Sequence, residues 1–127
     1  MGILEGKRIL VAGVTMESSI GYATARVAQE QGATVLISNF GQALRITRRI
    51  AKRLPTLPPV LELDVTDEEH LAAVPDAIRE HLGADAVLHG AVHSIAYGNP
   101  ETLLGGKFLT GPAGDVAQAV EVSAYSL

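Results

Sequence analysis

The sequence contains no cysteine, and this absence excludes disulfides, thiol catalysis and metal sites with cysteine ligands. A lack of cysteine suits the cytoplasm, where we expect the protein to be located. The sequence also lacks an excess of positive charge, because its formal net charge is -4. Proteins that bind nucleic acid are usually basic on at least one face, so we expect no nucleic-acid partner.

The sequence lacks a membrane signal as well. Its first apolar stretch, Ile9–Val14, is too short to span a bilayer, and no cleavable signal pattern precedes it. The start MGILEG has the penultimate glycine of a myristoylation site, but Gly6 stands where that motif requires Ser or Thr. We therefore expect no association with membranes.

What the sequence does contain is enough apolar material for one core. Apolar residues make up 47% of the 127 residues and charged residues 19%, which is typical of a well-buried globular protein. The stretch PTLPP is too short to separate domains and fits a loop between a helix and a strand. We therefore expect a single domain over residues 1–127.

Strand-like and helix-like patterns alternate along the chain. Short apolar runs predict buried strands, and the amphipathic stretches between them predict helices. The expected strands are Lys7–Gly13, Thr34–Phe40, Val60–Val65 and Ala84–Ser94; the expected helices are Ser19–Gly32, Gln42–Leu54, Thr66–Gly83 and Asp115–Leu127. Thr66–Glu69 is a capping pattern, and Pro75 predicts either a kink or two short helices.

This order of elements predicts an α/β fold with a doubly wound parallel sheet and helices on both faces. In such sheets ligands bind outside the carboxyl ends of the strands, where the strand order reverses. The expected strand ends are the turn at Gly13, then Ser38–Phe40, Asp64–Val65 and Ser94–Ala96. A binding site, if there is one, should form from these four places.

Each place also has a simpler interpretation. Gly13 could only permit a tight turn, and Ser18 or Ser19 could be an ordinary helix N-cap. Phe40 could be hydrophobic packing, and Asp64 could cap a turn.

The cations of the second expected helix fit a solvated face; they are Arg45, Arg48, Arg49, Lys52 and Arg53. His89 and His93 lie on an expected strand, where this spacing does not form a metal pair, so we expect no metal.

Several blocks of sequence, in order, carry a resemblance to a known family. They are GILEGKRILVAGV, ESSI, RVAQEQGA, ELDVTDEEHLA, VHSIAY and VSAYS. Together they resemble the NADH-dependent enoyl-acyl carrier protein reductases, and most of all their actinobacterial branch, within the short-chain dehydrogenase/reductase superfamily. The resemblance covers nearly the whole chain but only the N-terminal half of such an enzyme. It implies an incomplete Rossmann-like sheet of about four strands with flanking helices.

The resemblance also implies a role for each strand end. The family's turn has a glycine, five residues, a serine, one residue and a small residue, which here are Gly13, Ser19 and Gly21. Ser19 and Ile20 would hold the cofactor's pyrophosphate at the helix N-terminus. The remaining implied contacts are Phe40 and Val65 against the adenine ring, Asp64 to its amino group, Ser94, Ile95 and Ala96 along the ribose and nicotinamide, and Val122 nearby. The family often has glycine at the position of Ala96.

The implied cofactor is NADH. The second expected strand ends in Ser38-Asn39-Phe40-Gly41, without the acidic residue typical of NAD sites or an arginine for the phosphate of NADP. Arg45, about one helical turn further on, is the nearest cation. The resemblance therefore decides for NADH, and NADPH is the second choice.

The implied reaction is reduction of the trans-2 double bond of an enoyl thioester, carried by acyl carrier protein or coenzyme A. The family stabilises the enolate with a tyrosine and a lysine spaced as Tyr-x6-Lys. None of Tyr22, Tyr97 and Tyr125 has a lysine seven residues later. We therefore assign no catalytic residue and expect this chain alone to be inactive.

These features lead to two functional hypotheses. In the first, the chain is a truncated or partial form of a longer reductase, which the family implies to be a homotetramer. In the second, it is a dinucleotide-binding module without catalysis. A fourth strand without its neighbour would expose a long apolar edge, so we expect the fragment alone to self-associate.

Overall fold

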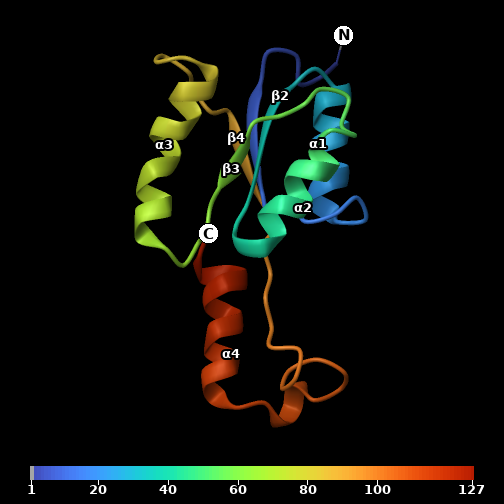
Figure 1. The fold of residues 1–127 in the computed structure, drawn as a ribbon, viewed down its shortest axis with the longest axis vertical. Coiled ribbons are helices and arrows are strands. Elements are labelled where there is room, and N and C mark those ends of the chain that lie inside the picture. The colour runs from blue at the N-terminus through green and yellow to red at the C-terminus, as the bar shows by residue number, and fades with distance from the viewer. Residues whose placement is uncertain (1) are drawn as a thin grey trace. The chain divides into compact units, whose positions relative to one another are not determined.

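A computed structural model describes residues 2–127, apart from the side chain of residue 108. The chain divides into two compact units, one that extends to Ser94 and one that comprises Ile95–Leu127. The first unit contains a parallel sheet in the order β3-β2-β1-β4 (Figure 1). Its strands are β1 (Arg8–Ala12), β2 (Thr34–Asn39), β3 (Val60–Glu62) and β4 (Gly90–His93).

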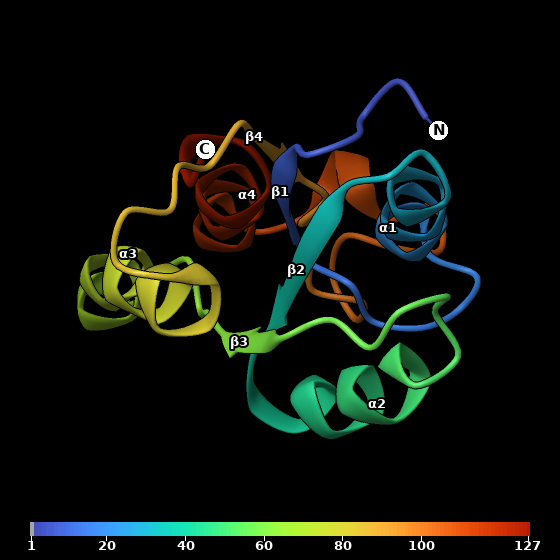
Figure 2. The same cartoon turned by 90° about the horizontal axis from the view of Figure 1, so that it is seen from above.

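Three helices connect these strands and cover both faces of the sheet. They are α1 (Ile20–Glu30), α2 (Gly41–Ala51) and α3 (Glu68–Leu82). Figure 2 shows α1 and α2 on one side of the sheet and α3 on the other. The expected doubly wound α/β arrangement is therefore confirmed.

The alternation of side chains along the strands produces two cores. Toward α1 and α2, the fully buried Val11 and Ile37 pack with Ala25 and Ala51. The opposite face of the sheet packs on α3 through Leu10, Leu36, Leu61 and Ile78. A sheet that is covered on both faces accounts for the continuous apolar strands of the sequence.

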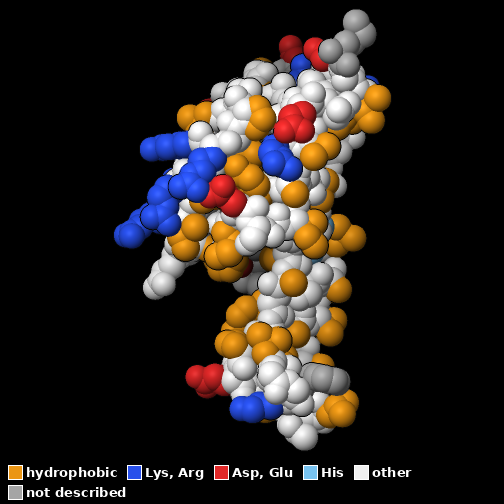
Figure 3. Space-filling model, turned by 90° about the vertical axis from the view of Figure 1, so that its right-hand side faces the viewer, with side chains coloured by type: hydrophobic (Ala, Val, Ile, Leu, Met, Phe, Trp, Pro, Cys, Tyr) orange, Lys and Arg blue, Asp and Glu red, His pale blue; other side chains and the backbone are white. Residues whose placement is uncertain are grey.

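The basic side chains of α2 lie on the side of the helix away from the sheet. Its buried positions are Leu44, Thr47, Ile50 and Ala51, whereas Arg45, Arg48, Arg49 and the following Lys52 are exposed. Lys and Arg side chains gather on one flank of the molecule in Figure 3. This agrees with the interpretation of a solvated face.

All four strands are shorter than the sequence suggested, and β3 and β4 differ most. Strand β3 ends at Glu62 rather than Val65, because its partner β2 ends at Asn39 and a turn begins at Asp64. Strand β4 starts at Gly90 rather than Ala84, because the segment of residues 3–6 that precedes β1 forms a turn and offers no strand to pair with. A turn closed by Ala86 N–H to Gly83 O occupies the start of the expected strand.

Pro75, where a kink or two short helices were expected, lies within α3. The chain runs as one helix through this residue, so the alternative of two short helices is wrong. Pro75 removes the hydrogen bond to the carbonyl of Leu71. Both residues are exposed, so water can reach this part of the helix.

The second unit contains the remaining helices. A 3₁₀ turn at Phe108–Thr110 precedes α4 (Ala113–Val120), and a π-helical turn follows at Glu121–Tyr125. The helix thus begins two residues before the expected Asp115. Within this unit, Tyr97 N–H donates to Ser123 Oγ at 3.0 Å, and Thr102 Oγ1 donates to Asp115 Oδ2 at 2.5 Å.

Candidate functional site

The carboxyl ends of the strands meet at one edge of the parallel sheet. The chain leaves β1 toward β2 on one side, and β4 lies on the other side of β1. The strand order therefore reverses between β1 and β4, which is the place where doubly wound sheets bind ligands. The residues that follow these strands form the candidate site.

Gly13 makes the turn after β1. Its φ of 92° lies in the left-handed region that side chains other than glycine rarely adopt. The N–H groups of Gly13 and Val14 both donate to the carbonyl of Ser38 on β2, at 3.0 and 3.1 Å. The turn is therefore fixed to the neighbouring strand.

Ser19 is the N-cap of α1, so of the two serines considered it is Ser19 that caps. Its Oγ accepts the N–H of Tyr22 at 3.3 Å and donates to the carbonyl of Met16 at 2.6 Å. The backbone N–H groups of Ile20 and Gly21 have no partner among the described residues. Unpaired N–H groups at a helix N-terminus favour an anion. The side chain of Ile20 is exposed.

Gly21 brings α1 against both strands at the reversal point. A Cβ on Gly21 would lie 3.2 Å from the Gly13 carbonyl oxygen, 3.2 Å from Val14 Cγ2 and 3.4 Å from Ser94 Cβ. Ser94 is in turn tied to β1, because its N–H donates to the carbonyl of Ala12 at 2.9 Å. The structure thus brings together Gly13, Gly21 and Ser94, which the sequence separates by up to 81 residues.

A buried polar network at the end of β2 supports the same turn. Asn39 Nδ2 donates to the Val14 carbonyl at 2.9 Å and to Thr15 Oγ1 at 3.1 Å. Thr47 of α2, fully buried, also donates to the Val14 carbonyl. Sequence analysis included Asn39 at a strand end without assigning it a role, and it missed Thr47. The available signal was a polar residue on an otherwise apolar strand or helix face.

Phe40 follows this network and begins α2. Its N–H donates to Asn39 Oδ1 at 2.9 Å, and its side chain is 40% exposed. It belongs to neither core cluster. Phe40 is therefore not part of the buried core, and its role at the site stays a prediction.

Asp64 and Val65 form the turn between β3 and α3. Asp64 Oδ1 accepts from Thr66 N–H at 2.9 Å and from Thr66 Oγ1 at 2.7 Å, so Asp64 does cap a turn. The N–H of Asp64 donates to Nδ1 of His70 at 2.9 Å. Val65 is buried. Sequence analysis also missed His70 as a site residue.

The N-cap of α3 is Asp67 rather than Thr66. Asp67 Oδ1 accepts the N–H groups of Glu69 and His70, at 2.9 and 3.3 Å. The helix is therefore capped, but the expected pattern of Thr66 with Glu69 is wrong. Thr66 instead completes the turn of Asp64.

The other predicted site residues, Ile95, Ala96 and Val122, belong to the second unit. Val122 is buried, Ile95 is half-buried and Ala96 is exposed. Their contribution to a site at the strand ends stays a prediction.

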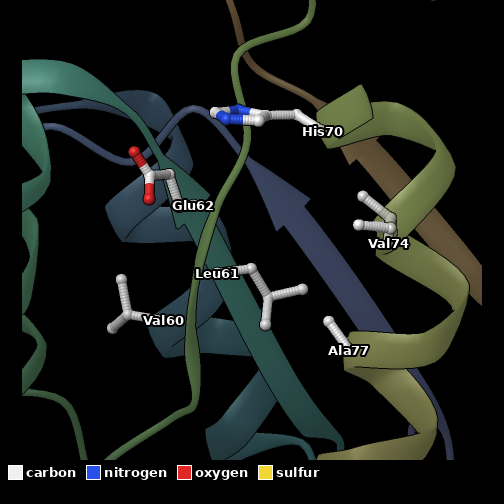
Figure 4. A pocket seen from close by; sticks show the side chains of 7 residues that line it. Val60, Leu61, Glu62, His70, Val74 and Ala77 are labelled. Carbon is white, nitrogen blue, oxygen red and sulfur yellow. The ribbon is translucent and has the colours of Figure 1, made fainter. Parts of the chain in front are cut away.

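One pocket lies between β3 and α3 (Figure 4). Its volume is about 150 Å³, and its lining includes Glu62, His70 and Val74.

No three His, Asp or Glu side chains gather as metal ligands anywhere in residues 2–127. Across the same residues, no helix is both long enough and apolar enough to cross a bilayer.

The sheet order, the glycine turn after β1 and the close approach of α1 define a Rossmann-like, doubly wound α/β protein. The chain belongs to the enoyl-acyl carrier protein reductase family, because the sequence model of the family described as "Enoyl-(Acyl carrier protein) reductase" matches residues 13–127. The resemblance seen in the sequence is thereby confirmed.

Curated relatives agree with this family. The enoyl-acyl-carrier-protein reductase (NADH) of Mycolicibacterium smegmatis is 44% identical over 98% of this chain and 46% of the relative. The enzyme of the same name from Mycobacterium avium is 42% identical over the same shares. That of Bacillus subtilis is 33% identical over 98% of this chain and 47% of the relative. The chain therefore spans about half the length of the curated relatives it matches.

Proposed function

We propose that the chain is the cofactor-binding half of an NADH-dependent enoyl-acyl carrier protein reductase of fatty-acid biosynthesis, with one dinucleotide-binding domain over residues 1–127. The observation that carries this proposal is the packing of Gly21 against Gly13 and Ser94 at the reversal of strand order. In dinucleotide folds a glycine at this place allows the helix to approach the strand closely, so that its N-terminus can face the pyrophosphate. The proposed reaction and the cofactor NADH are taken from the names of the curated relatives.

The pyrophosphate would bind at Gly13, Ser19 and Ile20. The unpaired N–H groups of Ile20 and Gly21 supply donors for phosphate oxygens, and the helix end adds a favourable dipole. The first turn of α1 holds no acidic residue that would repel an anion. Gly13 keeps side-chain atoms away from the path of the cofactor.

The adenine ring would bind among Phe40, Asp64 and Val65. Phe40 is exposed enough to offer a ring face, and Val65 supplies an apolar surface. Asp64 Oδ2 has no partner in the described part of the chain, so it can accept a hydrogen bond from the adenine amino group. The nicotinamide and its ribose would lie along Ser94, Ile95 and Ala96, with Val122 nearby.

NADH is preferred over NADPH in this proposal. At the end of β2, the amide of Asn39 is already used by the network with Val14 and Phe40. No cation follows it before Arg45, so a 2′-phosphate would lack an adjacent positive charge.

The whole protein would reduce the trans-2 double bond of enoyl thioesters carried by acyl carrier protein or coenzyme A, in the cytoplasm and as a homotetramer. The 127 residues contain no Tyr-x6-Lys pair. This favours a second candidate function for the chain alone, a dinucleotide-binding module without catalysis. The two candidates share the same cofactor site and differ only in whether the whole protein catalyses the reduction.

The experiment that tests the site is a calorimetric titration of the folded protein with NADH, NADPH and ADP-ribose. We expect NADH and ADP-ribose to bind at one site and NADPH to bind more weakly. Absence of NADH binding by protein whose circular dichroism shows a folded α/β chain would refute the proposal. Oxidation of NADH by enoyl-coenzyme A is assayed in parallel; we expect none under either candidate, and turnover by these 127 residues would refute the prediction that this chain alone is inactive.

A further inference from the structure

His70 connects α3 to the turn that would hold the adenine ring. It lies in the first turn of α3, and its Nδ1 accepts the backbone N–H of Asp64 at 2.9 Å. Figure 4 shows its imidazole extending from the start of α3 to the chain that leaves β3. Asp64 is therefore held at its backbone by His70 and at its carboxylate by Thr66.

This contact requires one protonation state of the ring. A nitrogen that accepts an N–H carries no proton, so Nδ1 is unprotonated and the proton of the neutral ring is on Nε2. Nε2 lies 3.7 Å from Asp67 Oδ2, toward which that proton can point. A second proton on Nδ1 would place two donors against each other and break the contact with Asp64.

We propose that His70 is a positioning residue of the adenine subsite. By accepting the Asp64 N–H, it holds Asp64 and Val65 where they contact adenine, and protonation of the ring on Nδ1 lowers the affinity for the adenine half of the cofactor. This inference rests on the proposed function, because it assumes that the turn binds adenine. It deepens that function by adding a residue that touches no cofactor atom and still controls the subsite.

The charged groups that face His70 are carboxylates. They are Asp64 and Asp67 in the turn and Glu62 on β3, which lines the same pocket. Free carboxylates titrate near pH 4, whereas an imidazole titrates between about pH 5 and 8. A difference in pH profile between the wild type and a variant without the imidazole, measured from about pH 5.5 to 8, isolates the contribution of this ring.

The test compares four proteins: the wild type, His70→Leu, His70→Asn and His81→Asn. Leucine removes the acceptor, whereas the Asn oxygen can replace Nδ1 without titrating. His81 is an exposed histidine in the last turn of the same helix and serves as the matched control. The ligands are ADP-ribose, which contains the adenine half, and reduced nicotinamide mononucleotide, which lacks it.

At pH 8 we expect His70→Leu to bind ADP-ribose about three- to tenfold more weakly, as for one net hydrogen bond, and to bind the mononucleotide unchanged. The affinity of the wild type and of His81→Asn for ADP-ribose should fall by a similar factor toward pH 5.5. His70→Asn should keep the wild-type affinity across the range.

Two results would overturn the inference: full affinity in His70→Leu, or an undiminished pH dependence in His70→Asn, which would assign the titration to another histidine. If His70→Leu does not fold, the pH profile of His70→Asn still decides. A wild type that binds ADP-ribose without any pH dependence refutes only the role of His70. A folded wild type that binds neither NADH nor ADP-ribose refutes the proposed function as well.

Discussion

Gly21 packs so closely on Gly13 that a Cβ at residue 21 would lie 3.2 Å from the carbonyl oxygen of residue 13. The contact joins the start of α1 to the turn after β1, and Ser94, which follows β4, completes it. Because the Gly13 carbonyl oxygen belongs to the backbone, this part of the contact cannot adapt by a change of rotamer. It is the point on which the candidate cofactor site depends most directly.

Replacement of Gly21 by valine should destabilise the protein and weaken the binding of NADH. The new side chain would press on Gly13, Val14 and Ser94, and overpacking of this kind costs about 1–3 kcal/mol. The free energy of unfolding is measured by urea denaturation. Ala23→Val, at an exposed position of the same helix, is the control for the lower helix propensity of valine. Equal stability of the two variants would contradict the prediction.

Removal of the Ser19 hydroxyl should reduce stability by about 1 kcal/mol, the usual effect of losing a helix N-cap. Ser19→Ala loses the contacts with Tyr22 and Met16. Ser18→Ala is the matched control, because the Ser18 side chain makes no hydrogen bond to the described residues. Thermal denaturation of both variants decides between the two serines, and an equal loss in each would show that Ser19 is not the effective cap.

A bulky side chain at residue 19 should weaken NADH binding by obstructing the pyrophosphate. We expect Ser19→Leu to bind NADH more weakly than Ser19→Ala, which loses the same cap without adding bulk. The comparison of the two dissociation constants separates obstruction from loss of the cap. Equal affinity of both variants would remove Ser19 from the cofactor site.

Loss of the Thr47 hydroxyl should destabilise the turn after β1. Thr47→Val keeps the shape of the side chain but removes one of the two hydrogen bonds to the Val14 carbonyl and one acceptor of Asn39 Nδ2, at a cost of about 0.5–1.5 kcal/mol. Thr24→Val is the control, because the hydroxyl of Thr24 only contacts the carbonyl of Ile20 in its own helix. Chemical denaturation of both variants tests the prediction, and a loss no larger in Thr47→Val would contradict it.

The order of elements could be predicted from the sequence because hydrophobic periodicity is a local property of the chain. The approximate positions of the strand ends followed from that order. It did not predict where β3 and β4 stop pairing, because these limits depend on the neighbours: β2 ends at Asn39, and residues 3–6 form a turn. The roles of Thr47 and His70 were also missed. Whether a polar side chain is buried against a backbone group far along the chain is a tertiary property that one sequence does not display.

The free edge of β4 should make the 127-residue chain self-associate. Within the described residues β4 pairs only with β1, and Ala91 on β4 and Val87 before it are exposed. An unpaired apolar edge favours pairing with another chain, and a charge on the edge opposes it. Sedimentation at roughly tens of micromolar, where exposed strand edges normally associate, should therefore show species larger than a monomer. Val87→Lys should shift them toward the monomer, whereas Val27→Lys, at an exposed position of α1, should not. A monomeric wild-type chain under these conditions would show that the edge is protected.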